Sequence, residues 1–421
     1  MSPELISILV LVVVFVIATT RSINMGALAF AAAFGVGTLV AGLDADGIFA
    51  GFPGSLFVVL VGVTYLFAIA HANGTTDWLV HGAVRLVGGR VALIPWMMFA
   101  ITGLLTAIGA VSPAAVAIVA PIALSFAARY KISPLLMGAM VVHGAQGGGF
   151  SPISIYGAIV NGIVADEGLA GDPVFLFLAS LVVNLVIAAV LFVVLGGLKL
   201  PRHAAEPVGD DEDASEDTAA RHLTPVRIAT LAALAALVVA VLGFDLDAGL
   251  TAISLAVLLS VFWPKTSKEA VAQISWPTVL LICGVITYVG VLQEMGTIDY
   301  AGNSVSDIGV PLLGALLICY IGAIVSAFAS SVGIMGALIP LAVPFLAQGQ
   351  VGAVGMIAAL AISATVVDVS PFSTNGALVL AAARDIDRDR FFRQLMVYGG
   401  IMVVVVPAVV WLAMVVPGFG R

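Results

Sequence analysis

Charged residues are scarce in this sequence: only 10% of its 421 residues are Asp, Glu, Lys or Arg, whereas 62% are hydrophobic. That balance excludes an ordinary soluble globular domain. Apolar runs of about 20 residues, long enough to cross a bilayer core, follow one another along the chain. The first run, Leu5 to Thr20, has no basic residue before it, so we interpret it as a retained helix and not as a signal peptide. The sequence therefore predicts an all-α polytopic membrane protein.

Cysteine is nearly absent as well. Cys283 and Cys319 lie inside apolar runs, where small core residues are a better interpretation than redox or metal ligands. The sequence has no zinc-ligand spacing, nucleophile elbow or kinase motif, and residues 147–149 (Gly-Gly-Gly) lack the Lys of a phosphate loop. Close packing or helix unwinding explains these glycines better. We expect no enzyme activity, no cofactor and no nucleic acid partner.

What the sequence does contain is a duplication. Residues 150–160 (Phe-Ser-Pro-Ile-Ser-Ile-Tyr-Gly-Ala-Ile-Val) recur as residues 369–379 (Val-Ser-Pro-Phe-Ser-Thr-Asn-Gly-Ala-Leu-Val). The same register pairs Ser112 with Ser331 and Pro121 with Pro340. Hydrophobic halves interrupted by Ser, Pro and Gly at matching places are typical of secondary transporters.

The duplication predicts a first repeat over residues 1–199, an acidic linker over 200–223 and a second repeat over 224–421. Each repeat is expected to have five transmembrane helices plus one re-entrant hairpin, and one of the five helices is discontinuous. The hairpins are expected at about 91–128 and 311–347, and the broken helices at about 134–164 and 352–383. The remaining helices are expected at residues 4–20, 24–41, 50–72, 173–199, 224–243, 248–263, 275–294 and 391–416.

Lys and Arg predict the orientation. In this layout every base except Arg421 falls on one side, and the opposite loops, such as residues 43–46 and 245–247, carry acids and no bases. Because short cytoplasmic loops are enriched in bases, we expect a cytosolic linker and two external termini. The two repeats then enter the membrane from opposite sides and are inverted. The expected location is a bacterial-type inner (plasma) membrane.

Each hairpin is expected to turn at a small, polar break, Gly109 to Pro113 in the first repeat and Ala329 to Gly333 in the second. Unpaired backbone at membrane depth survives only where protein or a water-filled cavity satisfies it, which favours a hairpin tip that faces a site. Two ordinary full crossings would also agree with the charges, so charge alone leaves that alternative open.

Helices that restart in mid-membrane point free N–H groups at one place and favour an anion there. The segments around the breaks contain no Lys or Arg, so an anion would be held by helix dipoles, neutral donors and co-bound cations. The candidate substrate-binding residues are Ser112, Pro113, Gln146, Ser151, Ser154, Tyr156, Ser330, Ser331, Gly333, Ser370, Ser373, Thr374 and Asn375. The candidate cation-binding residues, where Na⁺ is expected, are Ser112, Gly149, Ser331 and Asp368.

Asp368 is the one acid deep within a predicted span, and its counterpart in the first repeat is Gly149. An intramembrane carboxylate is a functional candidate, here for cation coordination or proton transfer. The alternative is an acid that caps the helix break. His143, one to two turns before the first break, is either a packed or cavity-facing residue or a proton relay, and we favour the former.

Residues 112–121, 150–158, 331–340 and 369–377 together resemble the ion-transporter superfamily. The nearest resemblance is to dicarboxylate (malonate) carriers of the MatC type, which are distantly similar to divalent anion:sodium symporters. The hairpin tips keep the leading Ser and the later Pro of those symporters but lack their Asn and Thr. The resemblance implies an elevator mechanism, in which hairpins and broken helices move as one body within a homodimer.

The predicted function is import of a small dicarboxylate, malonate or a C4 acid, by cation symport across the lipid bilayer. Na⁺ is favoured by the resemblance and by the hydroxyl-rich breaks, while Asp368 keeps H⁺ open. Two alternatives remain at this point: the membrane subunit of a TRAP-type, binding-protein-dependent transporter, and a Na⁺/H⁺ antiporter. Uptake by this chain alone would separate the first alternative from a symporter.

Overall fold

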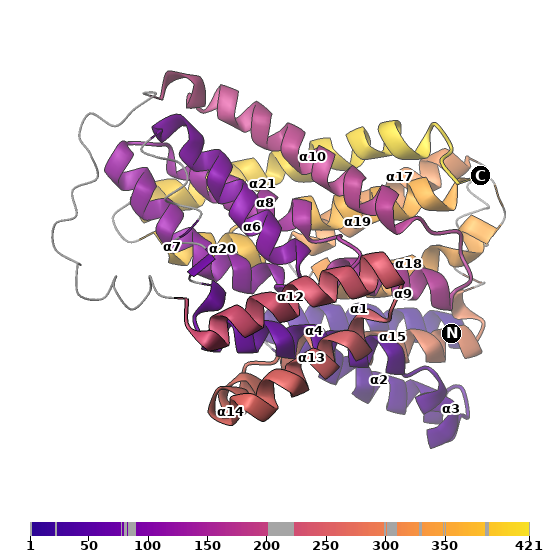
Figure 1. Cartoon of the computed structure of the whole chain (residues 1–421). Coiled ribbons are helices and arrows are strands. Elements are labelled where there is room, and N and C mark those ends of the chain that lie inside the picture. Colours follow the sequence, from indigo (N-terminus) through magenta and orange to yellow (C-terminus); the bar gives the residue numbers. More distant parts are fainter. Residues whose placement is uncertain are drawn as a thin grey trace.

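The computed structural model describes residues 2–21, 23–76, 78–79, 82, 90–200, 223–298, 300, 310–327, 331–347, 349, 351–383 and 387–420. Every regular element within these ranges is a helix. Most of the long helices run in one general direction across the molecule (Figure 1). Residues 201–222, nearly all of the predicted linker, lie outside the described residues.

The first half contains eleven helical elements among its described residues, in close agreement with the predicted spans. They are α1 (Pro3–Arg21), α2 (Met25–Leu39), α3 (Ala45–Ala50), α4 (Gly54–Ala72), α6 (Ile94–Ala107), α7 (Ser112–Tyr130), α8 (Pro134–Gly148), α9 (Ile155–Asp166) and α10 (Pro173–Val194), with a 3-10 turn at Val91–Leu93. A further 3-10 turn, Gly197–Lys199, follows α10.

The second half repeats this order. Its described helices are α12 (Pro225–Phe244), α13 (Ala248–Phe262), α14 (Pro264–Ala272), α15 (Trp276–Glu294), α17 (Pro311–Ser326), α18 (Ser331–Ala347), α19 (Ala353–Val366), α20 (Thr374–Ala381) and α21 (Arg388–Val410), which continues as a π-helical turn, Trp411–Val415. The interruptions at residues 149–154 and 367–373 fall where the broken helices were predicted.

Two short helices differ from the prediction. The expected helix 50–72 begins only at Gly54, because a turn containing Pro53 separates it from α3, whose start Asp44 caps. The helix α14, absent from the prediction, starts at Pro264, a residue that is well suited to a first helical turn. Both are too short to give the long apolar run on which the prediction depended.

Six of the described helices are long and apolar enough to cross a membrane. They are α4, α7, α10, α12, α15 and the helix formed by α21 and the turn after it. The seven other apolar helices are shorter, so the count of five crossings per repeat, the re-entrant hairpins and the inverted orientation stay predictions.

Glycines bring helix backbones into direct contact at equivalent places in the two halves. In the packing of α2 on α15, a Cβ on Gly26 would lie 1.9 Å from the Leu280 carbonyl oxygen, and one on Gly284 would lie 2.0 Å from that of Gly26. In the packing of α4 on α13, a Cβ on Gly62 would lie 2.5 Å from the Gly249 carbonyl oxygen. Small residues permit this approach of helices in membranes.

The first broken helix is packed in the same way. A Cβ on Gly148 would lie 2.0 Å from the Gly103 carbonyl oxygen of α6, and one on Gly144 would lie 2.2 Å from that of Phe99. The helix α8 ends at Gly148, with Gly149 as its C-cap. The run of three glycines is therefore both a packing surface and the point of unwinding, as predicted, and it fixes the position of the residues on α8.

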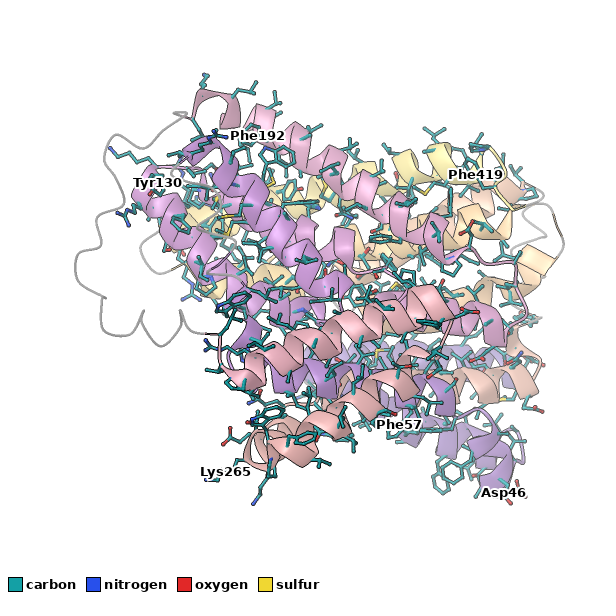
Figure 2. The ribbon with its side chains drawn as sticks, viewed as in Figure 1. Asp46, Phe57, Tyr130, Phe192, Lys265 and Phe419 are labelled. Carbon is teal, nitrogen blue, oxygen red and sulfur yellow. The ribbon has the colours of Figure 1, made fainter. Side chains whose placement is uncertain are left out.

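Lys265 and Asp46, a base and an acid, lie toward opposite ends of the bundle (Figure 2). In Figure 2, Lys265 and Tyr130 lie toward one end of the molecule, whereas Asp46 and Phe419 lie toward the other. Both chain ends are close to the second of these ends (Figure 1). The charge-based orientation, and the side of the membrane that each end faces, stay predictions.

Candidate transport site

The start of α7 meets the second helix break. No side chain caps the first turn of this helix, and the Ser112 hydroxyl, which is 3% exposed, accepts a hydrogen bond from Asn375 Nδ2 at 2.7 Å. Tyr156, on the first turn of α9, is buried and lies beside Ser112. Three predicted site residues from α7, α9 and α20 therefore come together at this helix start.

Asp368 lies next to this junction and is surrounded by hydrogen-bond donors. Its Oδ2 accepts from Asn375 Nδ2 at 2.9 Å and from Gln146 Nε2 at 3.2 Å, and its Oδ1 accepts from the Asn375 backbone N–H at 3.4 Å. The carboxylate therefore caps the start of α20, where the positive end of the helix dipole stabilises a negative charge. This geometry agrees with the capping alternative, and the capping and cation-binding roles are compatible.

Two side-chain oxygens beside Asp368 have no donor. Among the described residues, Oε1 of Gln146 and Oδ1 of Asn375 are buried without a hydrogen-bond partner. Both residues are fully buried and each gives its amide N–H₂ to Asp368. Unpaired buried acceptors are costly, so a pair of them at one place points to a donor or a cation that these oxygens meet during function.

The two serines that begin α9 and α20 have a structural task. Ser154 and Ser373 are the N-caps of these helices and accept hydrogen bonds from the backbone N–H of Gly157 and Gly376, respectively. The Ser154 hydroxyl also donates to the Gly149 carbonyl, and the Ser373 hydroxyl donates to the Ser370 carbonyl at 2.7 Å. Backbone groups at the breaks therefore occupy both hydroxyls.

The remaining predicted serines lie close to the breaks or at the second hairpin. The Ser151 carbonyl accepts from Ser154, and the Ser370 hydroxyl accepts from the Phe372 backbone N–H at 3.3 Å. At the start of α18, Ser331 bonds Ser326 at 2.8 Å, and the Cα position of Gly333 faces Leu281 and Met25. No hydrogen bond between described residues joins Ser331 or Gly333 to Asp368, and Ser330 lies outside the described residues.

A cavity of about 500 Å³ opens beside this cluster. Pro113 from the first turn of α7 and Thr374 from the first turn of α20 both line it, so two helix starts face the same space. Its described walls contain no Lys, Arg, Asp or Glu. The other lining residues are Thr64, Phe67, Ala68, His71, Val111, Ala114, Ala117, Ile118, Gln273, Ser275 and Thr278.

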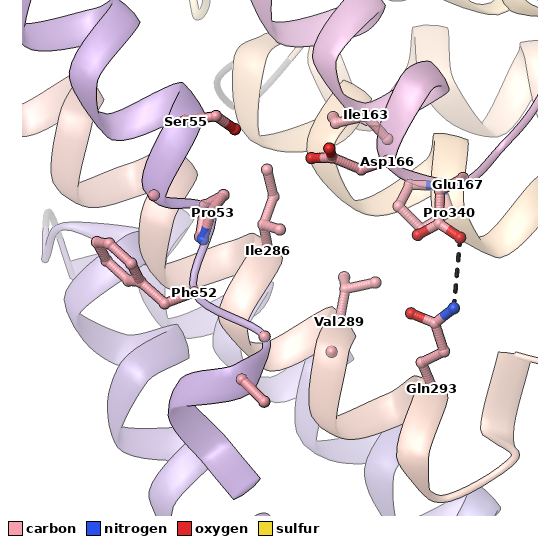
Figure 3. A pocket seen from close by; sticks show the side chains of 14 residues that line it. Phe52, Pro53, Ser55, Ile163, Asp166, Glu167, Ile286, Val289, Gln293 and Pro340 are labelled. Atoms are coloured by element: carbon pink, nitrogen blue, oxygen red, sulfur yellow. Dashed lines mark hydrogen bonds between the residues drawn. The ribbon is translucent and has the colours of Figure 1, made fainter. Parts of the chain in front are cut away.

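A second cavity, of about 330 Å³, lies between α9 and α15 (Figure 3). Asp166 and Glu167 line it, and Gln293 Nε2 donates to Glu167 Oε2 at 3.4 Å. Partial burial raises the pKa of the Glu167 carboxyl, and the bond from Gln293 opposes that shift. None of its described lining residues belongs to either helix break.

His143 connects three helices by hydrogen bonds. Its Nδ1 lies 2.8 Å from Asn184 Oδ1 on α10, and its Nε2 lies 2.5 Å from the Tyr398 hydroxyl on α21. Asn184 gives its N–H₂ group to the Ser180 carbonyl at 2.9 Å, which orients the amide oxygen as an acceptor for an Nδ1–H. A neutral His143 satisfies both contacts, in agreement with the packed role that we favoured.

Several of these residues were not predicted from the sequence, although signals for some were present. Ser180 and Asn184 are the polar residues of the 22-residue helix α10, spaced four apart and therefore on one face. Thr64 belongs to the segment Gly-Val-Thr-Tyr, whose echo in the second half includes Thr287. Tyr398 carried no signal, because only the packing of α21 brings it to His143.

Comparisons with known proteins agree with a carrier. Residues 1–149 match the family described as the N-terminus of the dicarboxylate carrier protein MatC. This confirms the predicted resemblance for that part of the chain. No curated protein sequence matches.

Solved structures extend the likeness over nearly the whole chain. The YdaH transporter of Alcanivorax borkumensis is 15% identical, with a TM-score of 0.57 over 88% of this chain and 89% of its own. MtrF of Neisseria gonorrhoeae, described with a class of antimetabolite efflux pumps, is 13% identical, with a TM-score of 0.60 over 98% and 95%. The chain is a membrane transporter. The carrier family and both structural neighbours also agree with the prediction that it is not an enzyme.

Proposed function

We propose that this transporter imports a small dicarboxylate together with a cation, with Na⁺ favoured over H⁺. The observation that carries the proposal is the cavity of about 500 Å³ onto which the first turns of α7 and α20 open. Its volume is in the range of small-molecule sites. The match of residues 1–149 to a dicarboxylate carrier family supports a dicarboxylate as the substrate, and we propose malonate or a C4 acid.

Charge balance supports the coupling to a cation. A dianion in this cavity would lie close to the buried carboxylate of Asp368, and no Lys or Arg lines the described walls. Uncompensated charges of one sign are costly in a low-dielectric interior. A cation that binds beside Asp368 would offset this repulsion, so the dicarboxylate and the cation would bind together.

The cation would find oxygen ligands at Asp368, Gln146 and Asn375. Rotation of either amide by half a turn would bring its unpartnered oxygen to the side that now faces Asp368. The Ser112 hydroxyl, 2.7 Å from Asn375 Nδ2, would be a fourth ligand. Carboxylate, carbonyl and hydroxyl oxygens suit hard cations such as Na⁺. This set keeps Ser112 and Asp368 of the predicted cation ligands and adds the two amides.

The transport cycle we propose is an elevator within a homodimer. The cavity of about 500 Å³ extends along α7 from its start, since Pro113, Ala114, Ala117 and Ile118 line it. The other end of α7, at Arg129 and Lys131, lies on the face predicted to be cytosolic. The described state would therefore face inward. Hairpins and broken helices would move together against the glycine-packed pairs α2–α15 and α4–α13.

The test is uptake by the purified chain alone in liposomes. Labelled malonate and succinate are offered under an inward Na⁺ gradient, under a matched K⁺ gradient, and under an imposed pH gradient. Uptake that follows only the Na⁺ gradient is the expected result. Uptake driven only by the pH gradient would replace Na⁺ by H⁺ at the same site.

Two other outcomes would overturn the proposal. Folded protein without uptake under any gradient would indicate a subunit that depends on a binding protein. Na⁺-driven proton movement that is indifferent to dicarboxylate would indicate an antiporter.

A further inference from the structure

A third cavity, of about 420 Å³, forms a groove between the end of α10 and the start of α21. Both helices pack on α8, whose residue Leu135 contributes to the floor of the groove. Val194 and Val397, 72% and 61% exposed, form part of its apolar walls. The groove is therefore a hydrophobic slot that is open toward the surroundings of the helix bundle.

The polar end of the groove is basic. Arg390 and Arg393, both exposed, line it from one face of the first turns of α21. Arg393 Nε donates to the Asp389 backbone carbonyl at 3.3 Å, a bond that leaves the positive charge unneutralised. No Asp or Glu is among the described lining residues. These two bases belong to the end of the bundle that is predicted to face the cytosol.

We propose that this groove binds an anionic phospholipid. Its phosphate would bind Arg390 and Arg393, and one acyl chain would lie along Val194, Val397 and Ile401. Basic pockets between transmembrane helices bind anionic lipid head groups in this way. A free phosphate would use the two bases but would leave the apolar walls uncovered, so the combination favours a lipid.

The groove is coupled to the transport site by one side chain. Tyr398 lines the groove, and its hydroxyl lies 2.5 Å from Nε2 of His143 on α8. Gln146, which bonds Asp368, lies one turn further along α8. A lipid that holds α10 and α21 at a fixed spacing would therefore stabilise the helix that positions Gln146, and bound lipid should increase both thermal stability and uptake.

The test uses the delipidated full chain in detergent, to which phosphatidylglycerol (PG) or phosphatidylcholine (PC) of identical acyl composition is added. We measure the melting temperature of the protein, and we measure bound lipid by native mass spectrometry. We expect PG to bind and stabilise the wild type, with about fivefold weaker binding for each lost base in Arg390→Gln and Arg393→Gln. Arg388→Gln is the matched control, because it removes the same charge from the same helix but does not line the groove. Val397→Trp, which fills the groove without changing charge, should also lose PG binding.

Three results would overturn the proposal. Equal PG binding by wild type and both arginine variants would exclude the groove. Equal stabilisation by PC would exclude recognition of an anionic head group. Full stabilisation by inorganic phosphate alone would show an anion site that needs no lipid.

Discussion

Replacing Asp368 with Asn removes a buried negative charge with almost no change of shape. The side chain is 3% exposed, and its two oxygens accept three hydrogen bonds from Gln146 and Asn375. An amide at this position has one acceptor oxygen. If that oxygen takes the place of Oδ2, the new N–H₂ group faces the Asn375 backbone N–H, which leaves one buried donor unpaired at a cost of about 1–3 kcal/mol.

The loss to cation binding is larger. A cation about 3 Å from the carboxylate gains about 5 kcal/mol at an effective dielectric constant of about 20. Loss of that attraction weakens cation binding on the order of 10³- to 10⁴-fold. The functional effect therefore exceeds the effect on stability, and we expect folded protein without gradient-driven uptake.

The assay is the initial rate of malonate uptake into proteoliposomes as a function of external Na⁺ concentration. Size-exclusion chromatography and the melting temperature report whether Asp368→Asn is folded. Asp172→Asn is the control, since Asp172 is an exposed N-cap of α10 and Asn caps helices equally well. A folded Asp368→Asn protein whose half-saturating Na⁺ concentration equals that of the wild type would refute the reasoning.

Three further substitutions probe the packing, the helix start and the smaller cavity. Gly148→Ala should lower stability by about 1–3 kcal/mol because its Cβ would lie 2.0 Å from a carbonyl oxygen, whereas Gly147→Ala, with a nearest contact of 3.4 Å, should be tolerated. The melting temperatures of the two variants are compared, and equal values would contradict the close packing. Ser112→Ala should weaken malonate uptake about tenfold because it removes one of the two acceptors of the Asn375 N–H₂ group, while Ser125→Ala on the same helix should transport normally. Equal KM values would exclude Ser112 from the site. Because the pKa of Glu167 is raised, its negative charge, which repels the dianion, develops only as the pH rises through that value. Glu167→Gln should therefore lower the KM for the dianion roughly twofold at neutral pH and physiological salt, and should have no effect well below the pKa. A difference in KM that does not depend on pH would contradict an electrostatic cause.

The helix breaks could be predicted from the sequence because their causes are local. Ser, Pro and Gly inside an apolar run interrupt a helix wherever the run is placed. For the same reason the N-cap roles of Ser154 and Ser373 were within reach: each precedes a helix start and accepts from an N–H three residues later. We assigned both to the substrate instead, and the structure shows that backbone groups occupy their hydroxyls.

The contacts across the breaks could not be predicted in this way. Asn375 donates to Ser112, 263 residues away, and Gln146 donates to Asp368, 222 residues away. Such pairs depend on how α7, α8 and α20 pack, which no local pattern encodes. The duplication indicated only that equivalent segments come together. Asp368 is the exception to the duplication, since Gly149 occupies its place in the first half.

The cavity between α9 and α15 is separate from the helix breaks, and this separation bears on the ion gradient across the membrane. A continuous file of water from one compartment to the other would conduct ions and discharge the gradient that is proposed to drive uptake. Glu167 and Gln293 line this cavity, and none of its described lining residues belongs to the breaks that hold Asp368. Ile163 and Ile286 add apolar side chains to the lining of this cavity (Figure 3). In the proposed cycle, this separation would keep ions on their own side of the membrane until the protein itself moves.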